Sequence, residues 1–187
     1  MTNTPHYFIA IPLPDFLKEQ YSQWQKQLKE QLSYKQWPYK EDLHITLKFL
    51  GPVEEEQLSK LQNELTSLER KTAFELFTGQ LGYFGNPRKP RVLWAGVEKT
   101  GSLEDLHQEV EKHASAAGFQ SENRPYSPHI TLAKKWAGDI SNLQELKKNF
   151  IGQHKMAVDK VVIYRIYPGN SPKYRIEASY NLKGGTE

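Results

Sequence analysis

The chain alternates between apolar runs with strand character and longer segments with helical spacing. Runs rich in β-branched and aromatic residues, or alternating apolar with polar positions, predict strands. These runs cover residues 6–13, 43–50, 74–84, 91–97, 128–134, 156–167 and 173–182. Apolar side chains that recur every three or four positions predict amphipathic helices. These segments are residues 15–32, 53–68, 102–117 and 140–150. Asp15 and Ser102 are the expected N-caps of the first and third helices.

The order of these elements occurs twice along the chain. Each half begins with a strand, continues with a helix and reaches a second strand that contains the word His-Ile-Thr-Leu, at His44 and at His129. The spacing from Phe8 to His44 equals the spacing from Leu93 to His129 (44 − 8 = 129 − 93 = 36). A word that repeats in register with the element order indicates an internal duplication.

The two halves cover approximately residues 6–84 and 91–182. Neither a long linker nor a low-complexity segment separates them. We therefore expect residues 1–187 to form a single two-lobed domain, in which the halves pack about a pseudo-two-fold axis.

The repeated word places chemistry on one face of each strand. Residues two apart in a strand point the same way, so His44 projects with Thr46, and His129 projects with Thr131. The opposite faces carry the apolar side chains Ile45, Leu47, Phe49, Ile130 and Leu132. We expect the apolar faces to pack under helices and the His-Thr faces to line a cleft.

Two imidazoles and two hydroxyls around one point suit displacement at phosphorus. One histidine can activate the nucleophile and the other can protonate the leaving oxygen. The threonine hydroxyls can donate to the phosphoryl oxygens between them. A catalytic zinc usually has a third protein ligand, and neither copy supplies one at a matching position, so we expect no metal and no cofactor. The remaining histidines have no counterpart in the other half and are expected outside the site: His6, His107, His113 and His154.

Composition narrows the class of protein further. There is no cysteine, which excludes disulfides, thiolate metal sites and cysteine nucleophiles. The net charge of +3 fits a phosphate-bearing partner. No apolar stretch approaches the ~18 residues of a membrane span, and the N-terminus lacks the features of a signal peptide. We expect a cytoplasmic monomer.

Four segments also carry a family resemblance. They are Phe-Ile-Ala-Ile-Pro-Leu at residues 8–13, Leu-His-Ile-Thr-Leu-Lys-Phe-Leu-Gly at 43–51, Pro-Arg-Val-Leu-Trp at 90–94, and Arg-Pro-Tyr-Ser-Pro-His-Ile-Thr-Leu-Ala-Lys at 124–134. Over nearly its whole length the chain resembles the two-histidine phosphoesterase superfamily. Within it, the resemblance is to the bacterial and archaeal RNA 2′,3′-cyclic phosphodiesterases, historically named 2′-5′ RNA ligases.

The resemblance implies both a fold and a reaction. The fold is α+β, with two pseudo-symmetric lobes around a central cleft, each an antiparallel sheet with helices on its outer face. The reaction opens a 2′,3′-cyclic phosphate on an RNA end or nucleotide and leaves a 2′-phosphomonoester. By resemblance His44 is the proton donor and His129 the proton acceptor. The two near-identical motifs do not themselves distinguish these roles.

Substrate contacts are expected next to the motifs, at Lys48, Lys134, Arg124 and Tyr126. The family often has arginine where the two lysines stand, and lysine loses the bidentate geometry toward phosphate. Lys134 follows His129 by an odd number, so only a bulge or a strand end would turn it toward the cleft. The basic loop of residues 88–91 is a further candidate for contact with an RNA backbone.

Two other functions remain open from the sequence. The same chemistry would serve an enzyme that cleaves or joins 2′-5′ linked oligonucleotides, or one that opens a small cyclic-phosphate metabolite. The chain could also be a non-catalytic module that binds RNA or nucleotides, although intact His-Thr pairs in both copies argue against that function.

Overall fold

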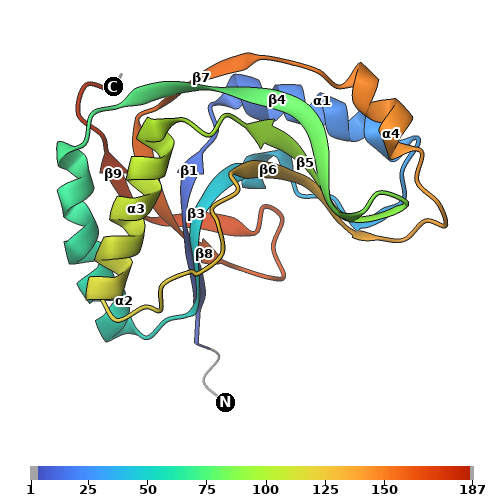
Figure 1. Cartoon of the computed structure of the whole chain (residues 1–187). Helices are drawn as coiled ribbons and strands as arrows, with labels where there is room; N and C mark the ends of the chain where they lie inside the picture. Colours follow the sequence, from blue (N-terminus) through green and yellow to red (C-terminus); the bar gives the residue numbers. More distant parts are fainter. Residues whose placement is uncertain (1–3, 186–187) are drawn as a thin grey trace.

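A nine-stranded antiparallel sheet and four α-helices make up the α+β fold of residues 4–185 in the computed structural model (Figure 1). The strands are β1 (His6–Pro12), β2 (Tyr34–Gln36), β3 (His44–Pro52), β4 (Phe74–Asn86), β5 (Lys89–Val97), β6 (His129–Trp136), β7 (His154–Val158), β8 (Lys160–Ile166) and β9 (Tyr174–Asn181). The helices are α1 (Asp15–Lys29), α2 (Glu55–Leu65), α3 (Gly101–Ala116) and α4 (Leu143–Leu146). The α+β class predicted from the sequence is confirmed.

The sheet has two parts that meet at its centre. Its strand order is β7-β4-β5-β6-β3-β1-β8-β9, and β2 pairs with β6. We call β3, β1, β8 and β9 the first half-sheet, and β7, β4, β5, β6 and β2 the second half-sheet. They join between β3 and β6, where the ladder contains the single pair Ile45–Ile130. The sequence predicted a separate sheet for each lobe, whereas the structure joins both into one sheet at this pair.

The halves of the sequence exchange strands between the half-sheets. β4 belongs to the first half of the chain but pairs with β5 and β7. The segment 156–167, predicted as one strand, is two strands that separate at Asp159. β7 pairs with β4 at one edge, and β8 pairs with β1 in the other half-sheet. This break was missed because no glycine or proline interrupts the apolar pattern there.

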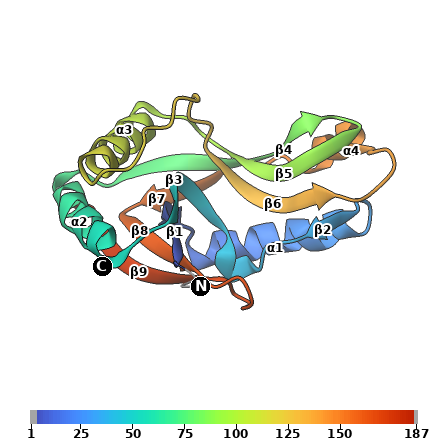
Figure 2. The same cartoon turned by 90° about the horizontal axis from the view of Figure 1, so that it is seen from below.

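The helices exchange in the same way. α1 follows β1 but packs on the second half-sheet, where Tyr21 and Thr78 share a buried hydrogen bond of 2.6 Å. α3 follows β5 but lies beside α2 on the first half-sheet, where Lys48 of β3 bonds to Glu111. Both views show α2 and α3 together at one end and α1 with α4 at the other (Figures 1 and 2). Among residues 4–185, no helix has the length and apolar character needed to cross a bilayer.

Several helix boundaries depart from the sequence prediction, including the ends of α1 and α2, which stop at Lys29 and Leu65. The residue that caps α3 is Thr100, whose hydroxyl accepts from the Leu103 N–H at 3.2 Å, so the Ser102 prediction is wrong. Pro14 occupies the N-cap position of α1, and Asp15 lies in the first turn, where its charge favours the helix dipole. The fourth helix shortens to α4, followed by a 3₁₀ turn over Lys147–Asn149.

Candidate active site

The joint between the half-sheets gathers the repeated motif. Ile45 and Ile130 are paired and fully buried. Paired residues of antiparallel strands point the same way, and their neighbours point to the other face. The register therefore places His44 toward Thr131 and Thr46 toward His129 on that other face. A cavity of about 120 Å³, here called the histidine pocket, is lined by His44, Thr46 and Thr131 together.

His44 is held by the strand it begins. Its Nδ1 donates to the carbonyl oxygen of Asp42 at 2.7 Å, because a carbonyl only accepts. In the neutral ring Nε2 then accepts from the Thr46 hydroxyl at 2.9 Å. Phe8 and Tyr174 pack on the ring, with centroids 4.7 and 5.4 Å away. Burial lowers the pKa of His44 to about 4, against the opposing effect of the Asp42 hydrogen bond.

His129 repeats this arrangement in the second copy. Its Nδ1 donates to the carbonyl oxygen of Ser127 at 2.7 Å, again two residues before the histidine. Phe84 meets the ring edge-on at a centroid distance of 4.8 Å. Burial lowers the pKa of His129, and the charge of Lys134 adds to that effect. Both imidazoles are therefore neutral at pH 7 in the free protein, with Nδ1 protonated.

A bulge follows each histidine by three residues and resets the strand alternation. β3 shifts register against β1 at Leu47, and β6 shifts against β5 at Leu132. Beyond the bulges, Lys48 is buried, whereas Phe49 and Lys134 line the histidine pocket. The sequence predicted that Lys134 would face the cleft only if a bulge or a strand end turned it. The bulge at Leu132 does so. Phe49 was predicted on the core face, but it is 63% exposed, because a strict period of two does not survive a bulge.

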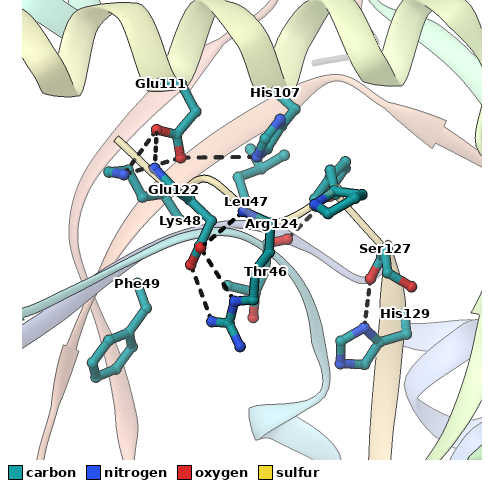
Figure 3. A pocket seen from close by; sticks show the side chains of 12 residues that line it. Thr46, Leu47, Lys48, Phe49, His107, Glu111, Glu122, Arg124, Ser127 and His129 are labelled. Carbon is teal, nitrogen blue, oxygen red and sulfur yellow. Dashed lines mark hydrogen bonds and ion pairs between the residues drawn. The ribbon is translucent and has the colours of Figure 1, made fainter. Parts of the chain in front are cut away.

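A second cavity of about 340 Å³ adjoins the first through Thr46 and Phe49 and also contains His129. We call it the carboxylate pocket, because acidic side chains accompany its cations (Figure 3). Lys48 Nζ donates to both carboxylate oxygens of Glu111, at 3.0 and 2.9 Å, and to the carbonyl oxygen of Gln120 at 2.9 Å. The three donors of this ammonium group are therefore used within the protein.

Arg124 and Tyr126, the other two predicted contacts, also lie in the carboxylate pocket. The guanidinium of Arg124 is exposed and makes two hydrogen bonds to Glu122, of 3.2 and 3.1 Å. The Tyr126 hydroxyl donates to the carbonyl oxygen of Thr46 at 3.0 Å. Its ring stacks on His107 with a centroid distance of 3.9 Å. Tyr126 therefore braces the strand that carries the first motif.

Sequence reasoning missed two residues that shape the site. His107 was expected outside it, yet it lines the carboxylate pocket, and burial lowers its pKa. Asp42 is buried, and its carboxylate accepts from the backbone N–H groups of Lys173 and Tyr174 at 2.9 to 3.0 Å. Because its backbone carbonyl accepts from the His44 ring, Asp42 links that ring to the segment before β9. No local signal marks this role, because the partners lie about 130 positions away.

No group of three His, Cys, Asp or Glu side chains within residues 4–185 is arranged to hold a metal ion. His6, His113 and His154 do not line the histidine pocket. His113 instead links α3 to Ser67 after α2, at 2.7 Å.

Comparison with known proteins gives consistent matches. The signature of the 2′-5′ RNA ligase superfamily matches residues 13–170. An RNA 2′,3′-cyclic phosphodiesterase of Bacillus subtilis is 35% identical over 171 residues, covering 91% of this chain and 92% of the relative. A protein of the same name from Geobacillus stearothermophilus is 33% identical over 184 residues, 97% of this chain, and the chain spans 59% of that protein's length.

Solved structures show the same fold. The crystal structure of E. coli LigT in complex with 3′-AMP superposes with a TM-score of 0.80 at 24% identity, covering 96% of this chain and 99% of LigT. At this identity the likeness concerns the fold.

Proposed function

Because the chain belongs to the 2′-5′ RNA ligase superfamily, we propose that it hydrolyses a 2′,3′-cyclic phosphate on an RNA end or nucleotide. The observation that carries the proposal is the Ile45–Ile130 joint, which sets two His-Thr pairs on one face of the sheet. Relatives named RNA 2′,3′-cyclic phosphodiesterases support the substrate class. The nucleotide held by E. coli LigT, in a similar fold, supports it further.

The proposed step is an in-line displacement without metal or cofactor. His129 Nε2 takes a proton from a water molecule, whose oxygen attacks phosphorus. The bond from phosphorus to the 3′-oxygen breaks on the opposite side, and His44 Nε2 gives that oxygen its proton. The product is a 2′-phosphomonoester with a free 3′-hydroxyl. Thr46 and Thr131 donate to the remaining phosphoryl oxygens, where charge accumulates.

The proton donor must first acquire its proton. His44 is neutral at pH 7 in the free protein, since burial holds its pKa at about 4. A bound phosphate anion next to the ring favours the imidazolium and raises that pKa. Protonated Nε2 no longer accepts from Thr46, so the threonine hydroxyl is released to bond the phosphate. Lys134, which lines the same pocket, supplies a further positive charge.

Alanine at either histidine tests the acid–base assignment. His44→Ala and His129→Ala are each expected to lower kcat on a 2′,3′-cyclic nucleotide by about 10²–10⁴-fold. Binding of the nucleotide product, measured by calorimetry, should remain largely intact in both variants. His6→Ala, which removes an exposed imidazole at the start of β1, is the matched control. Turnover close to wild type in either motif variant would refute the assignment.

A further inference from the structure

A third cavity, of about 330 Å³, continues from the histidine pocket and shares no lining residue with the carboxylate pocket. It shares Asp42, Lys134 and Tyr174 with the histidine pocket. Its other walls come from the segment that contains β2 and from the connection between β8 and β9. We call it the lysine groove, and its main side chains are Lys35, Trp37, Tyr39, Lys134, Lys173 and Tyr174.

The charges of the lysine groove are not balanced within the protein. Within residues 4–185, no carboxylate lies within ion-pair distance of Lys35, Lys134 or Lys173. Asp42 is the one acid that lines the groove, and backbone N–H groups already engage its carboxylate. The lysines are close enough that the charge of Lys173 lowers the pKa of Lys134, after the larger effect of burial.

The carboxylate pocket and the lysine groove differ in their charge balance. In the carboxylate pocket, Glu111 and Glu122 neutralise Lys48 and Arg124. Of the two cavities that adjoin the histidine pocket, the lysine groove therefore carries the excess of positive charge. Unpaired cations in a groove attract a polyanion, and they lower the free energy of its bound state through counterion release.

Aromatic side chains accompany these cations. Tyr39 is 54% exposed, and Trp37 and Tyr174 are half-buried in the groove wall. Single-stranded nucleic acids are commonly bound by grooves of this composition, in which cations follow the phosphates and aromatic rings stack the bases. Of these cations and aromatic side chains, only Lys134 and Tyr174 also line the histidine pocket.

We propose that the lysine groove binds the nucleotides on the 5′ side of the cyclic phosphate, so that the preferred substrate is an RNA strand. The inference rests on the proposed function. A cyclic phosphate ends the strand at its 3′ side, so the rest of the RNA leaves the histidine pocket in the 5′ direction. The lysine groove is the charged exit that opens directly from that pocket through Lys134.

The test compares two substrates that end in the same cyclic nucleotide, a free 2′,3′-cyclic nucleotide and an RNA pentamer. The wild-type protein should prefer the pentamer, and only that preference should fall with added salt. Lys35→Glu combined with Lys173→Glu should lower kcat/KM for the pentamer about tenfold, mainly through KM. Turnover of the cyclic mononucleotide should change less than about twofold, which also shows that the variant is folded.

Lys60→Glu provides the matched control, because this exposed lysine of α2 lies outside the groove. Equal kcat/KM for both substrates in the wild type would overturn the proposal. A second outcome would also overturn it: the pentamer preference survives in the Lys35→Glu, Lys173→Glu variant but is lost in an Arg88→Glu, Lys89→Glu variant. That result would place the RNA strand on the β4–β5 hairpin.

Failure of the proposed function has a different signature, since neither substrate would then be turned over. In that event, fluorescence anisotropy of a labelled pentamer still tests the groove. Weaker binding by the Lys35→Glu, Lys173→Glu variant than by Lys60→Glu supports it, and equal binding contradicts it.

Discussion

In both His44 and His129, the Nδ1–H group donates a hydrogen bond to the carbonyl oxygen two residues before the histidine. That bond fixes the tautomer and leaves Nε2 unprotonated in both neutral rings, and in His44 this atom accepts from the Thr46 hydroxyl. The surroundings differ, because aromatic rings of Phe8 and Tyr174 enclose His44, whereas Phe84 contacts His129. The two imidazoles are therefore oriented alike but differ in their environment, which is what separate acid and base roles require.

Proton uptake on binding follows from these pKa values. At pH 7 both histidines are neutral before binding, and a phosphate anion raises the pKa of the proton donor. Binding of a 2′-nucleotide product is expected to take up a proton from the buffer. Calorimetry in two buffers of different ionisation enthalpy measures it. Uptake should disappear in His44→Ala and persist in His129→Ala; the reverse pattern would exchange the two roles.

The histidines and threonines could be named from the sequence because the repeat doubles a short word. The residues around them could not. Lys48 and Arg124 were predicted as substrate contacts from their type and position, but their acidic partners were not predicted: Glu111 lies on α3, and Glu122 lies in the loop that holds Arg124. The pair of Lys48 and Glu111 joins residues 63 positions apart and leaves no local pattern, whereas Glu122 stands two positions before Arg124.

At the scale of elements, the bulges at Leu47 and Leu132 decide which side chains reach the cleft. Each places two consecutive buried residues in its strand and reverses the alternation beyond. The second bulge is supported from α1, where the buried Gln25 amide donates to the Leu132 carbonyl at 2.9 Å. A sequence pattern alone assigns faces by parity, which explains why Ile45 was placed correctly and Phe49 was not.

The pair of Lys48 and Glu111 joins β3 to α3, and both side chains are largely buried. Glu111→Ala leaves the ammonium group buried without a counter-charge and is expected to lower the free energy of unfolding by about 3–5 kcal/mol. Adding Lys48→Met should restore most of that loss. Urea unfolding followed by circular dichroism measures both variants.

The control for this prediction is Glu75→Ala, which breaks an exposed pair with Lys155. Exposed pairs contribute about 0–1 kcal/mol, so little change is expected there. If Glu111→Ala and Glu75→Ala cost the same, the buried pair does not hold α3 against the sheet.

At the scale of the whole molecule, the exchange of strands and helices makes each half-sheet depend on both halves of the chain. β4 from the first half completes the second half-sheet, and β8 and β9 from the second half complete the first. The element order predicted the repeat, and the duplication stays a prediction. The exchange itself was not predictable, because pairing partners far apart in sequence leave no mark on local periodicity.

This exchange predicts a single unfolding transition. All four tryptophans (Trp24, Trp37, Trp94 and Trp136) belong to the second half-sheet or to segments packed against it. Leu61→Ala opens a cavity in α2, beside the first half-sheet, and is expected to cost about 2–5 kcal/mol. Tryptophan fluorescence and circular dichroism should shift to the same lower urea midpoint. An unchanged fluorescence midpoint would show that the half-sheets unfold independently.

The central claim is tested most directly by the product of one reaction. Purified protein is incubated with EDTA and each 2′,3′-cyclic nucleotide, alone and at the end of a short RNA, and 2′- and 3′-phosphates are separated. We predict a 2′-phosphate from the wild-type protein without added metal, and its loss in His44→Ala and His129→Ala. No product from any of these substrates, or turnover that requires a restored metal ion, would contradict metal-free acid–base catalysis by the two histidines.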